Sequence, residues 1–178
     1  MNLPEFRYHP DPIGSGSIVA SEAECRSCGE SRGYVYAGPV YSEDELDDAL
    51  CPWCIADGSA HAKFDATFVD GEAFAVETPD AAVCEITART PGFNTWQGEK
   101  WPCCCGDAAA FVGPAGIQEL RATPELEGLA LNHIFYEMGI SGGAARRYLE
   151  SLHRDAGPTA YVFRCLACGG NLFHMDNL

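Results

Sequence analysis

Residues 25–54 read CRSCGESRGYVYAGPVYSEDELDDALCPWC, a stretch that opens and closes on a Cys-x-x-Cys pair. Two residues between cysteines allow one tight turn to direct both sulfur atoms at a single ion. Structural zinc takes four ligands, commonly from two such pairs about 15 to 20 residues apart, and the 22 residues between these pairs are close to that range. The sequence therefore predicts a zinc site whose ligands are Cys25, Cys28, Cys51 and Cys54.

A glycine directly follows the first pair and also the last pair of the chain, in CRSCG (25–29) and CLACG (165–169). Glycine adopts the left-handed backbone that turns amide N–H groups back toward the sulfur atoms. Both segments are therefore predicted to be zinc knuckles.

The residues between the first two pairs support a small zinc domain. GYVYAGPVYS (33–42) alternates aromatic and β-branched residues around Gly-Pro, which favours a β-hairpin. Ser42 with Glu45 three residues later is typical of a capping box and predicts a short helix near 43–50 that leads into CPWC. A knuckle, a hairpin and a second pair near a helix form the order of a treble clef or a zinc ribbon.

The third pair, Cys165 and Cys168, needs two more ligands. The candidates are Cys84 and the run Cys103-Cys104-Cys105, and the run is preferred because two ligands can come from one turn. We expect a second zinc site formed by the last pair and two members of the run, and the spacing leaves open which two. Cys84 lies in the apolar, strand-like AAVCEI and is expected to be a buried, inert thiol.

Metal binding is favoured over disulfides by the expected compartment. MNLPEFRYHPDP (1–12) has neither the cationic start nor the apolar run of a signal peptide, and no stretch has 18 consecutive apolar residues. We therefore expect a cytoplasmic protein without membrane insertion, in which thiols stay reduced. Cys51-Pro-Trp-Cys54 also resembles a dithiol redox motif, but no βαβ pattern surrounds it.

The overall fold is predicted to be α+β, with an N-terminal zinc lobe over 1–72 and a second zinc-stapled lobe over 73–178, or one fused domain. Ile18 and Val19 open a strand, and residues 73–88 alternate enough to suggest strands. Residues 115–153 have helical spacing of apolar residues, with Pro124 at the first position of one helix and a final helix over 144–153.

The remaining loops and strands of both lobes are predicted from local signals. TPGFNTWQGEKWP (90–102) is expected to be an aromatic-rich loop, either a ligand surface or rings packed over the core. TAYVFRC (159–165) and GNLFHMD (170–176) flank the last knuckle as two antiparallel strands. GSGS (14–17) lacks the lysine of a P-loop and is expected to be a plain turn.

Composition limits the possible partners. The chain has 178 residues, of which 47% are hydrophobic, so it is long and apolar enough for a globular core. Its 11 basic and 26 acidic residues sum to −15, and a field of that sign repels nucleic-acid backbones. Arg146-Arg147 is the one small basic cluster, and a solvated helix face is preferred for it over an anion site. His133 and His153 are expected to be surface or satisfied core residues, not ligands. A protein partner with basic features suits this surface better.

Several segments resemble the CbrC-like family of bacterial proteins, and the likeness spans nearly the whole chain. Its most specific pieces are CPWCIADGSA and TPGFxxWQ. The segments that carry it are FRYHPDP (6–12), GSIVASEAECRSCG (16–29), GPVYSEDELDDALCPWCIADGSAHAKFDATFVD (38–70), RTPGFNTWQGEKWPCCCGDAAAF (89–111) and YVFRCLACG (161–169).

The resemblance implies a cytoplasmic, zinc-binding protein with no established catalytic activity. The residues at the family's recurrent cysteine positions are Cys25, Cys28, Cys51, Cys54, Cys165 and Cys168. Cys104 and Cys105 fall where relatives commonly carry a His-Cys or Cys-Cys pair. Many relatives have a further cysteine where this chain has Ala109, so Cys103 or Cys104 completes the second site here, or that site is weaker or lost.

Three classes of function follow. The first is a non-catalytic, zinc-stabilised binding or adaptor protein, because an all-thiolate site has no open position to activate water. The second is a zinc enzyme with an open second site of Cys105, Cys165, Cys168 and water, for which Asp107 is a candidate base and His174 lies near the last pair. No H-E-x-x-H or deaminase signature occurs, and a nucleic-acid-reading zinc ribbon is a third, weaker alternative.

Overall fold

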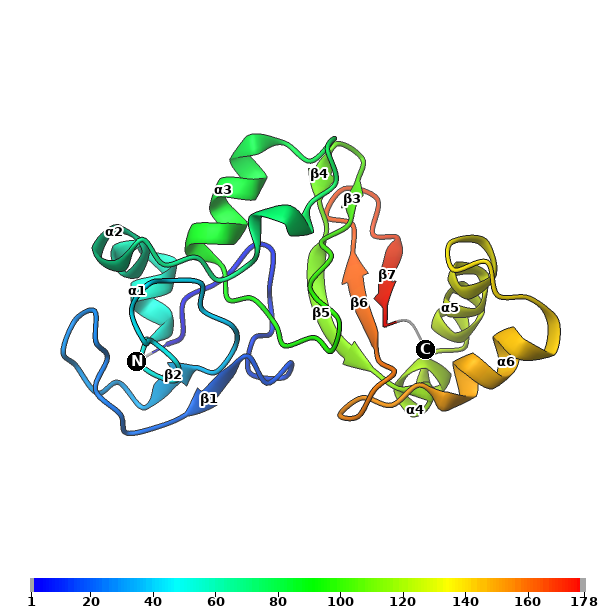
Figure 1. Cartoon of the computed structure of the whole chain (residues 1–178), viewed down its shortest axis with the longest axis horizontal. Helices are drawn as coiled ribbons and strands as arrows, with labels where there is room; N and C mark the ends of the chain where they lie inside the picture. Colours follow the sequence, from blue (N-terminus) through cyan, green and yellow to red (C-terminus); the bar gives the residue numbers. More distant parts are fainter. Residues whose placement is uncertain (1, 177–178) are drawn as a thin grey trace.

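The computed structural model describes residues 2–176, which form a mixed structure of helices and short antiparallel sheets. A three-stranded sheet lies in the middle of the molecule (Figure 1). The N-terminal segment with its short sheet and helices lies on one side of it, and the last three helices lie on the other. None of the described helices is long and apolar enough to cross a membrane.

The first sheet pairs β1 (Ile18–Ala20) with β2 (Tyr34–Tyr36) in antiparallel register, so the predicted strand at Ile18 is confirmed. The predicted hairpin over 33–42 is wrong, because β2 pairs with β1 and not with the residues that follow it. Gly38 lies against the ring of Tyr36, so closely that a Cβ there would be 2.6 Å from the ring carbons. The chain after β2 therefore folds back over that ring.

The helix predicted near 43–50 is also wrong, since this segment is a bent loop. The Ser42 hydroxyl accepts a hydrogen bond from the Asp44 N–H, which makes a local turn in place of a helix cap. Asp48 has a left-handed φ of 51°, and the buried Leu46 and Leu50 anchor the loop to the core. The helices start later, at α1 (Pro52–Ala56) and α2 (Ser59–Phe64).

Residues 73–88 were expected to form strands, but they contain helix α3 (Asp80–Arg89), preceded by the 3-10 turn η1 (Gly71–Ala73). Ala82 and Ile86, four residues apart, are the buried positions of α3, which is the spacing of one helical face. Cys84 lies off that face and is exposed, so the prediction of a buried thiol is wrong as well.

The central sheet has the order β5-β6-β7 and is antiparallel throughout. Its strands are β5 (Ala110–Ala115), β6 (Ala160–Arg164) and β7 (Asn171–Met175), and the last two confirm the predicted strands around the final knuckle. A small hairpin of β3 (Cys103–Cys104) and β4 (Asp107–Ala108) directly precedes β5.

Helices α4 (Ile117–Ala122), α5 (Pro124–Tyr136) and α6 (Gly142–Ser151) confirm the predicted helical region. The glycine-containing segment 139–143 breaks the pattern as expected, although α6 already begins at Gly142. These helices cover one side of the sheet and enclose an apolar group with Leu120, Ile134 and Phe173.

Two further apolar groups fill the rest of the molecule. The first surrounds Cys25, Cys51 and Cys54 with Phe6, Tyr36 and Phe68. The second is an aromatic stack in which Phe93 lies 3.9 Å from Phe111, centroid to centroid, with Trp101 and Phe163 against them. Phe93 and Trp101 come from the aromatic-rich loop, so those two rings pack over the core, whereas Trp96 is 63% exposed. The division at residue 72 stays a prediction.

Candidate metal centres

The four N-terminal cysteines meet at one point between the first sheet and α1. The Sγ atoms of Cys25, Cys28, Cys51 and Cys54 all lie within 4.8 Å of one another, and those of Cys28 and Cys51 are 3.9 Å apart. Four sulfurs around a zinc ion, each at about 2.3 Å, are about 3.8 Å apart in a tetrahedron. The donor set and its spacing therefore fit zinc. We call these residues the first cysteine group.

Backbone geometry explains how CRSCG brings its two sulfurs together. The Gly29 N–H donates to the Cys25 carbonyl at 2.7 Å, and Gly29 has the left-handed φ of 74° that was predicted for a knuckle. The Lys63 ammonium donates to the carbonyls of Arg26 and Ser27 at 2.8 and 3.0 Å, which fixes the turn from outside. The first predicted knuckle thus has the expected backbone.

CPWC brings the second pair by a different route. Cys51 is the residue before α1, Pro52 occupies the first turn of the helix, and Cys54 follows within it. The Cys51 N–H donates to the Cys25 sulfur at 3.2 Å, so the helix start also hydrogen-bonds the knuckle. Hydrogen bonds from the Cys51 thiol and from backbone N–H groups lower the pKa of Cys25 to about 4, which favours the thiolate that metals bind.

The second cysteine group consists of Cys104, Cys105, Cys165 and Cys168, whose sulfurs also lie within 4.8 Å of one another. The Cys104 sulfur is 3.7 Å from that of Cys105 and 4.0 Å from that of Cys168. Cys103 stands apart from this group, with its sulfur 4.0 Å from the Glu77 carbonyl oxygen. The structure therefore distinguishes Cys103 from the two ligand candidates Cys104 and Cys105, which the spacing of the cysteines left open.

Two adjacent cysteines can share one ion because they lie at a hairpin turn. Cys105 and Gly106 connect β3 to β4 and have φ angles of 54° and 76°, the left-handed pair that a type I′ turn requires. In a straight strand, neighbouring side chains point to opposite faces. The turn removes that restriction and brings the Cys105 sulfur beside that of Cys104.

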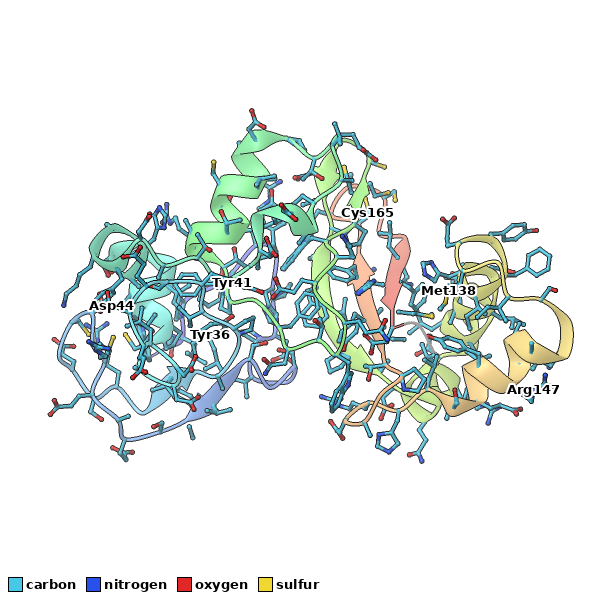
Figure 2. All side chains as sticks on the ribbon, viewed as in Figure 1. Tyr36, Tyr41, Asp44, Met138, Arg147 and Cys165 are labelled. Carbon is cyan, nitrogen blue, oxygen red and sulfur yellow. The ribbon has the colours of Figure 1, made fainter. Side chains whose placement is uncertain are left out.

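CLACG supplies the other half of the second group with the same backbone as CRSCG. Gly169 donates to the Cys165 carbonyl at 3.0 Å and has a φ of 72°. Backbone N–H groups of Cys168 and Ala167 lower the pKa of Cys165 to about 6. Figure 2 shows Cys165 at the end of β6 beside the β3–β4 hairpin, so the second group joins the middle of the chain to its end.

Comparison with known proteins identifies the family of the chain. A model of the uncharacterised protein family UPF0167 matches residues 3–177. This chain belongs to UPF0167. It is 48% identical to UPF0167 proteins of Mycobacterium bovis and Mycobacterium tuberculosis over 98% of its length and 93% of theirs. It is 44% identical to one of Pseudomonas aeruginosa over 98% of its length and 97% of that protein. No solved structure matches it significantly.

The two polar residues suggested for an open second site have other partners in this UPF0167 chain. The Asp107 carboxylate accepts hydrogen bonds from Arg7 at 2.6 Å and from Tyr8 at 2.9 Å, so it holds the N-terminal segment on the hairpin. The His174 ring stacks on Tyr161, and its Nε2 lies 3.1 Å from the Gly98 carbonyl. Neither side chain belongs to a cysteine group.

Burial distinguishes the two groups in this UPF0167 chain. In the first, Cys25, Cys51 and Cys54 are buried and belong to an apolar core. In the second, only Cys165 is buried, whereas Cys105 and Cys168 are exposed. The first group is thus part of the core, and the second lies near the surface, where it joins two distant segments of the chain. All ten cysteines, which lie within the described residues, are free thiols.

Proposed function

We propose that this UPF0167 member is a binding or adaptor protein whose fold is held by two structural, non-catalytic zinc ions. The observation that carries the proposal is the donor set, since each group offers four sulfurs. Zinc bound to four thiolates has no open position for water, and its binding contributes folding free energy, about 10 kcal/mol or more in small peptides. Closed sites of this kind support the fold without carrying out chemistry.

We further propose that the first centre is of the treble-clef type. The knuckle at Cys25 and Cys28 faces a second pair at the start of α1, which is the arrangement of that class. The likeness of the chain to the CbrC-like family, and with it a cytoplasmic location, remains an inference from the sequence.

The expected partner is a protein with a basic surface. The net charge of −15 supports this inference, because it attracts cationic surfaces and repels nucleic acids. The bent loop over 43–48 exposes Glu43, Asp44, Glu45, Asp47 and Asp48 beside the first cysteine group. Leu46 is buried within that loop, so the acidic side chains are presented on an anchored backbone.

Native mass spectrometry combined with thiol alkylation tests the metal part of this proposal. We expect two zinc ions per chain, eight thiols that react only after denaturation, and rapid alkylation of Cys84 and Cys103. A single zinc ion, with the second cysteine group open to alkylation, would contradict the proposal and make enzyme assays at that group worthwhile.

Calorimetric titration with a lysine-rich peptide tests the binding part. The control is a glutamate-rich peptide of the same length. We expect binding of the lysine-rich peptide that weakens with salt and with neutralisation of the 43–48 carboxylates by Asn and Gln. Equal binding after neutralisation would remove this loop from the proposal.

A further inference from the structure

A buried histidine outside both cysteine groups holds a serine hydroxyl. His9 is fully buried, and its two ring nitrogens each have one close partner. Nδ1 lies 2.7 Å from the Pro91 carbonyl oxygen, and Nε2 lies 2.7 Å from Ser15 Oγ. A carbonyl oxygen can only accept, so the ring proton is on Nδ1 and Nε2 accepts the proton of the Ser15 hydroxyl.

This arrangement has the parts of an activated nucleophile. Such sites combine a hydroxyl, an imidazole within hydrogen-bond reach and a third group that fixes the imidazole tautomer. Here the third group is the Pro91 carbonyl. The edge-on contact of His9 with Phe111, 5.0 Å between ring centroids, fixes the plane of the ring as well.

Ser15 is also accessible, because it lines a cavity of about 320 Å³. Its neighbours are Gly14 and Gly16, so no adjacent side chain covers the hydroxyl. A Cβ at Gly14 would lie 2.1 Å from an oxygen of the Asp11 carboxylate, which accepts a hydrogen bond from the Gly14 N–H, so a side chain there would displace Asp11. The loop therefore places Ser15 on the cavity wall, with its Oγ 2.7 Å from His9 Nε2, 3.1 Å from the Pro12 carbonyl oxygen and 3.2 Å from Ser17 Oγ.

The walls of the cavity suit an acyl group. Phe93, Trp96 and Phe111 supply apolar surface on its sides. Arg154 also lines it, and its guanidinium donates to the Gly14 carbonyl at 2.6 Å, beside the backbone of Ser15, and lies 3.8 Å from the carboxylate of Asp155, which lines the cavity too. A cation at that place can stabilise the oxyanion that forms when a carbonyl is attacked.

We propose that Ser15 is the nucleophile of a second, independent site that hydrolyses acyl groups held on good leaving groups, namely thioesters or aryl esters. His9 is the base in this proposal, and the Pro91 carbonyl is its orienting partner. The site lies apart from both cysteine groups, so it goes beyond the adaptor role and does not depend on it.

The reaction has two steps. In the first, Ser15 Oγ bonds to the acyl carbon, its proton moves to His9 Nε2, and the carbon–sulfur or carbon–oxygen bond breaks, with the electron pair leaving on the thiolate or phenolate. In the second, the oxygen of water bonds to the acyl carbon, the bond between that carbon and Oγ breaks, and Oγ takes back the proton held on His9 Nε2. One water proton goes to solvent, and the carboxylic acid is released. His9 lies behind Ser15 and not on the cavity wall, which is why the leaving group must depart as an anion.

A fluorophosphonate probe tests the nucleophile directly, because a phosphorus–oxygen bond forms at an activated serine while fluoride leaves. We expect one adduct per zinc-loaded chain by intact mass, located by peptide mapping on Ser15. Ser15→Ala should abolish the adduct, and Ser141→Ala, at an exposed serine outside the cavity, should retain it. Hydrolysis of p-nitrophenyl butyrate should follow the same pattern, lost in Ser15→Ala and retained in the control variant.

His9→Asn keeps a donor for the Pro91 carbonyl but removes the acceptor for Ser15, and labelling should slow by about 100-fold or more. Urea-denatured wild type also lacks the His9–Ser15 arrangement, without any substitution, and it should not be labelled. Absence of an adduct on the folded wild type, or an adduct that survives Ser15→Ala, would overturn the proposal. Either result leaves the zinc count and alkylation pattern unchanged, so the adaptor proposal is tested separately.

Discussion

Cys25 and Cys165 begin two backbone turns of the same form, 140 positions apart. The carbonyl of each accepts a hydrogen bond from the glycine four residues later, at 2.7 Å in the first turn and 3.0 Å in the second. The N–H of each donates to the carbonyl five residues later, at 3.0 and 2.8 Å. One local device is thus used in two different surroundings, a buried core and an exposed hairpin.

Replacement of Gly29 or Gly169 by alanine should test this device. Both have φ angles above 70°, where a Cβ costs about 1 kcal/mol, and no atom approaches the new Cβ closer than 3.6 Å. We expect each variant to lose about 1 kcal/mol of unfolding free energy in urea titrations of the zinc-loaded protein. Gly71→Ala, in open space without a left-handed φ, is the matched control and should change little. Equal stability of all three variants would show that the turns do not require glycine.

The run Cys103–Cys105 offers a second test, because adjacent cysteines have different surroundings. The Cys104 sulfur belongs to the second group, and the Cys103 sulfur faces the Glu77 carbonyl. We expect Cys104→Ser to bind one zinc ion and Cys103→Ser to bind two, as counted by native mass spectrometry. The opposite result would mean that Cys103 is the ligand and that the hairpin turn is arranged differently in solution.

Features specified by neighbouring residues could be predicted from the sequence. The two knuckles are of this kind, since Cys-x-x-Cys-Gly defines its own turn, and so are the strands on either side of CLACG. The helices after residue 115 follow from their apolar spacing. The first group of four could also be predicted, because both of its pairs carry the same local signal.

Features decided by distant contacts could not be predicted in this way. The strand β2 takes β1 as its partner because the chain after Tyr36 folds over that ring. Ser42 with Glu45 looks like a helix cap, but the burial of Leu46 and Leu50 holds the loop open. Asp107 lies close to the cysteines in sequence, yet its carboxylate accepts a hydrogen bond from Arg7, a hundred residues earlier.

The unequal burial of the two groups predicts that zinc is released in two phases. Cys105 and Cys168 are exposed, whereas three ligands of the first group are in the core, so a chelator should reach the second group first. With excess chelator and a zinc-sensitive dye, we expect one ion to leave at least ten times faster than the other. The intermediate should be alkylated at the second group only.

Two cysteine variants assign these phases. Cys105→Ser should remove the fast phase and leave the slow one, while Cys84→Ser, also exposed but outside both groups, should leave both phases unchanged. Loss of the slow phase in Cys105→Ser would reverse the assignment. Release of both ions at one rate would show that the two centres open together.

Glu99 should make the stability of the protein depend on pH. It is only 7% exposed, its Oε2 accepts a hydrogen bond from the Asp70 N–H, and its Oε1 has no hydrogen-bond partner within the described residues. Burial raises the pKa of this carboxyl from its ordinary value of 4.5 to about 7. The folded protein therefore binds a proton that the unfolded chain has already lost between those two values.

Stability must then fall as pH rises through that window, because the state with more bound protons is favoured at low pH. The loss is complete above pH 7 and amounts to at most about 3 kcal/mol. Glu99→Gln keeps an acceptor for Asp70 and imitates the neutral carboxyl, so the excess stability of the variant over the wild type should be smallest near pH 5 and largest at pH 8. Urea titrations of both proteins across this range measure the difference, and acid release of zinc cancels between them. Glu125→Gln on the exposed surface of α5 is the control and should run parallel to the wild type. A Glu99→Gln curve that also runs parallel would show that Glu99 is already ionised at pH 5.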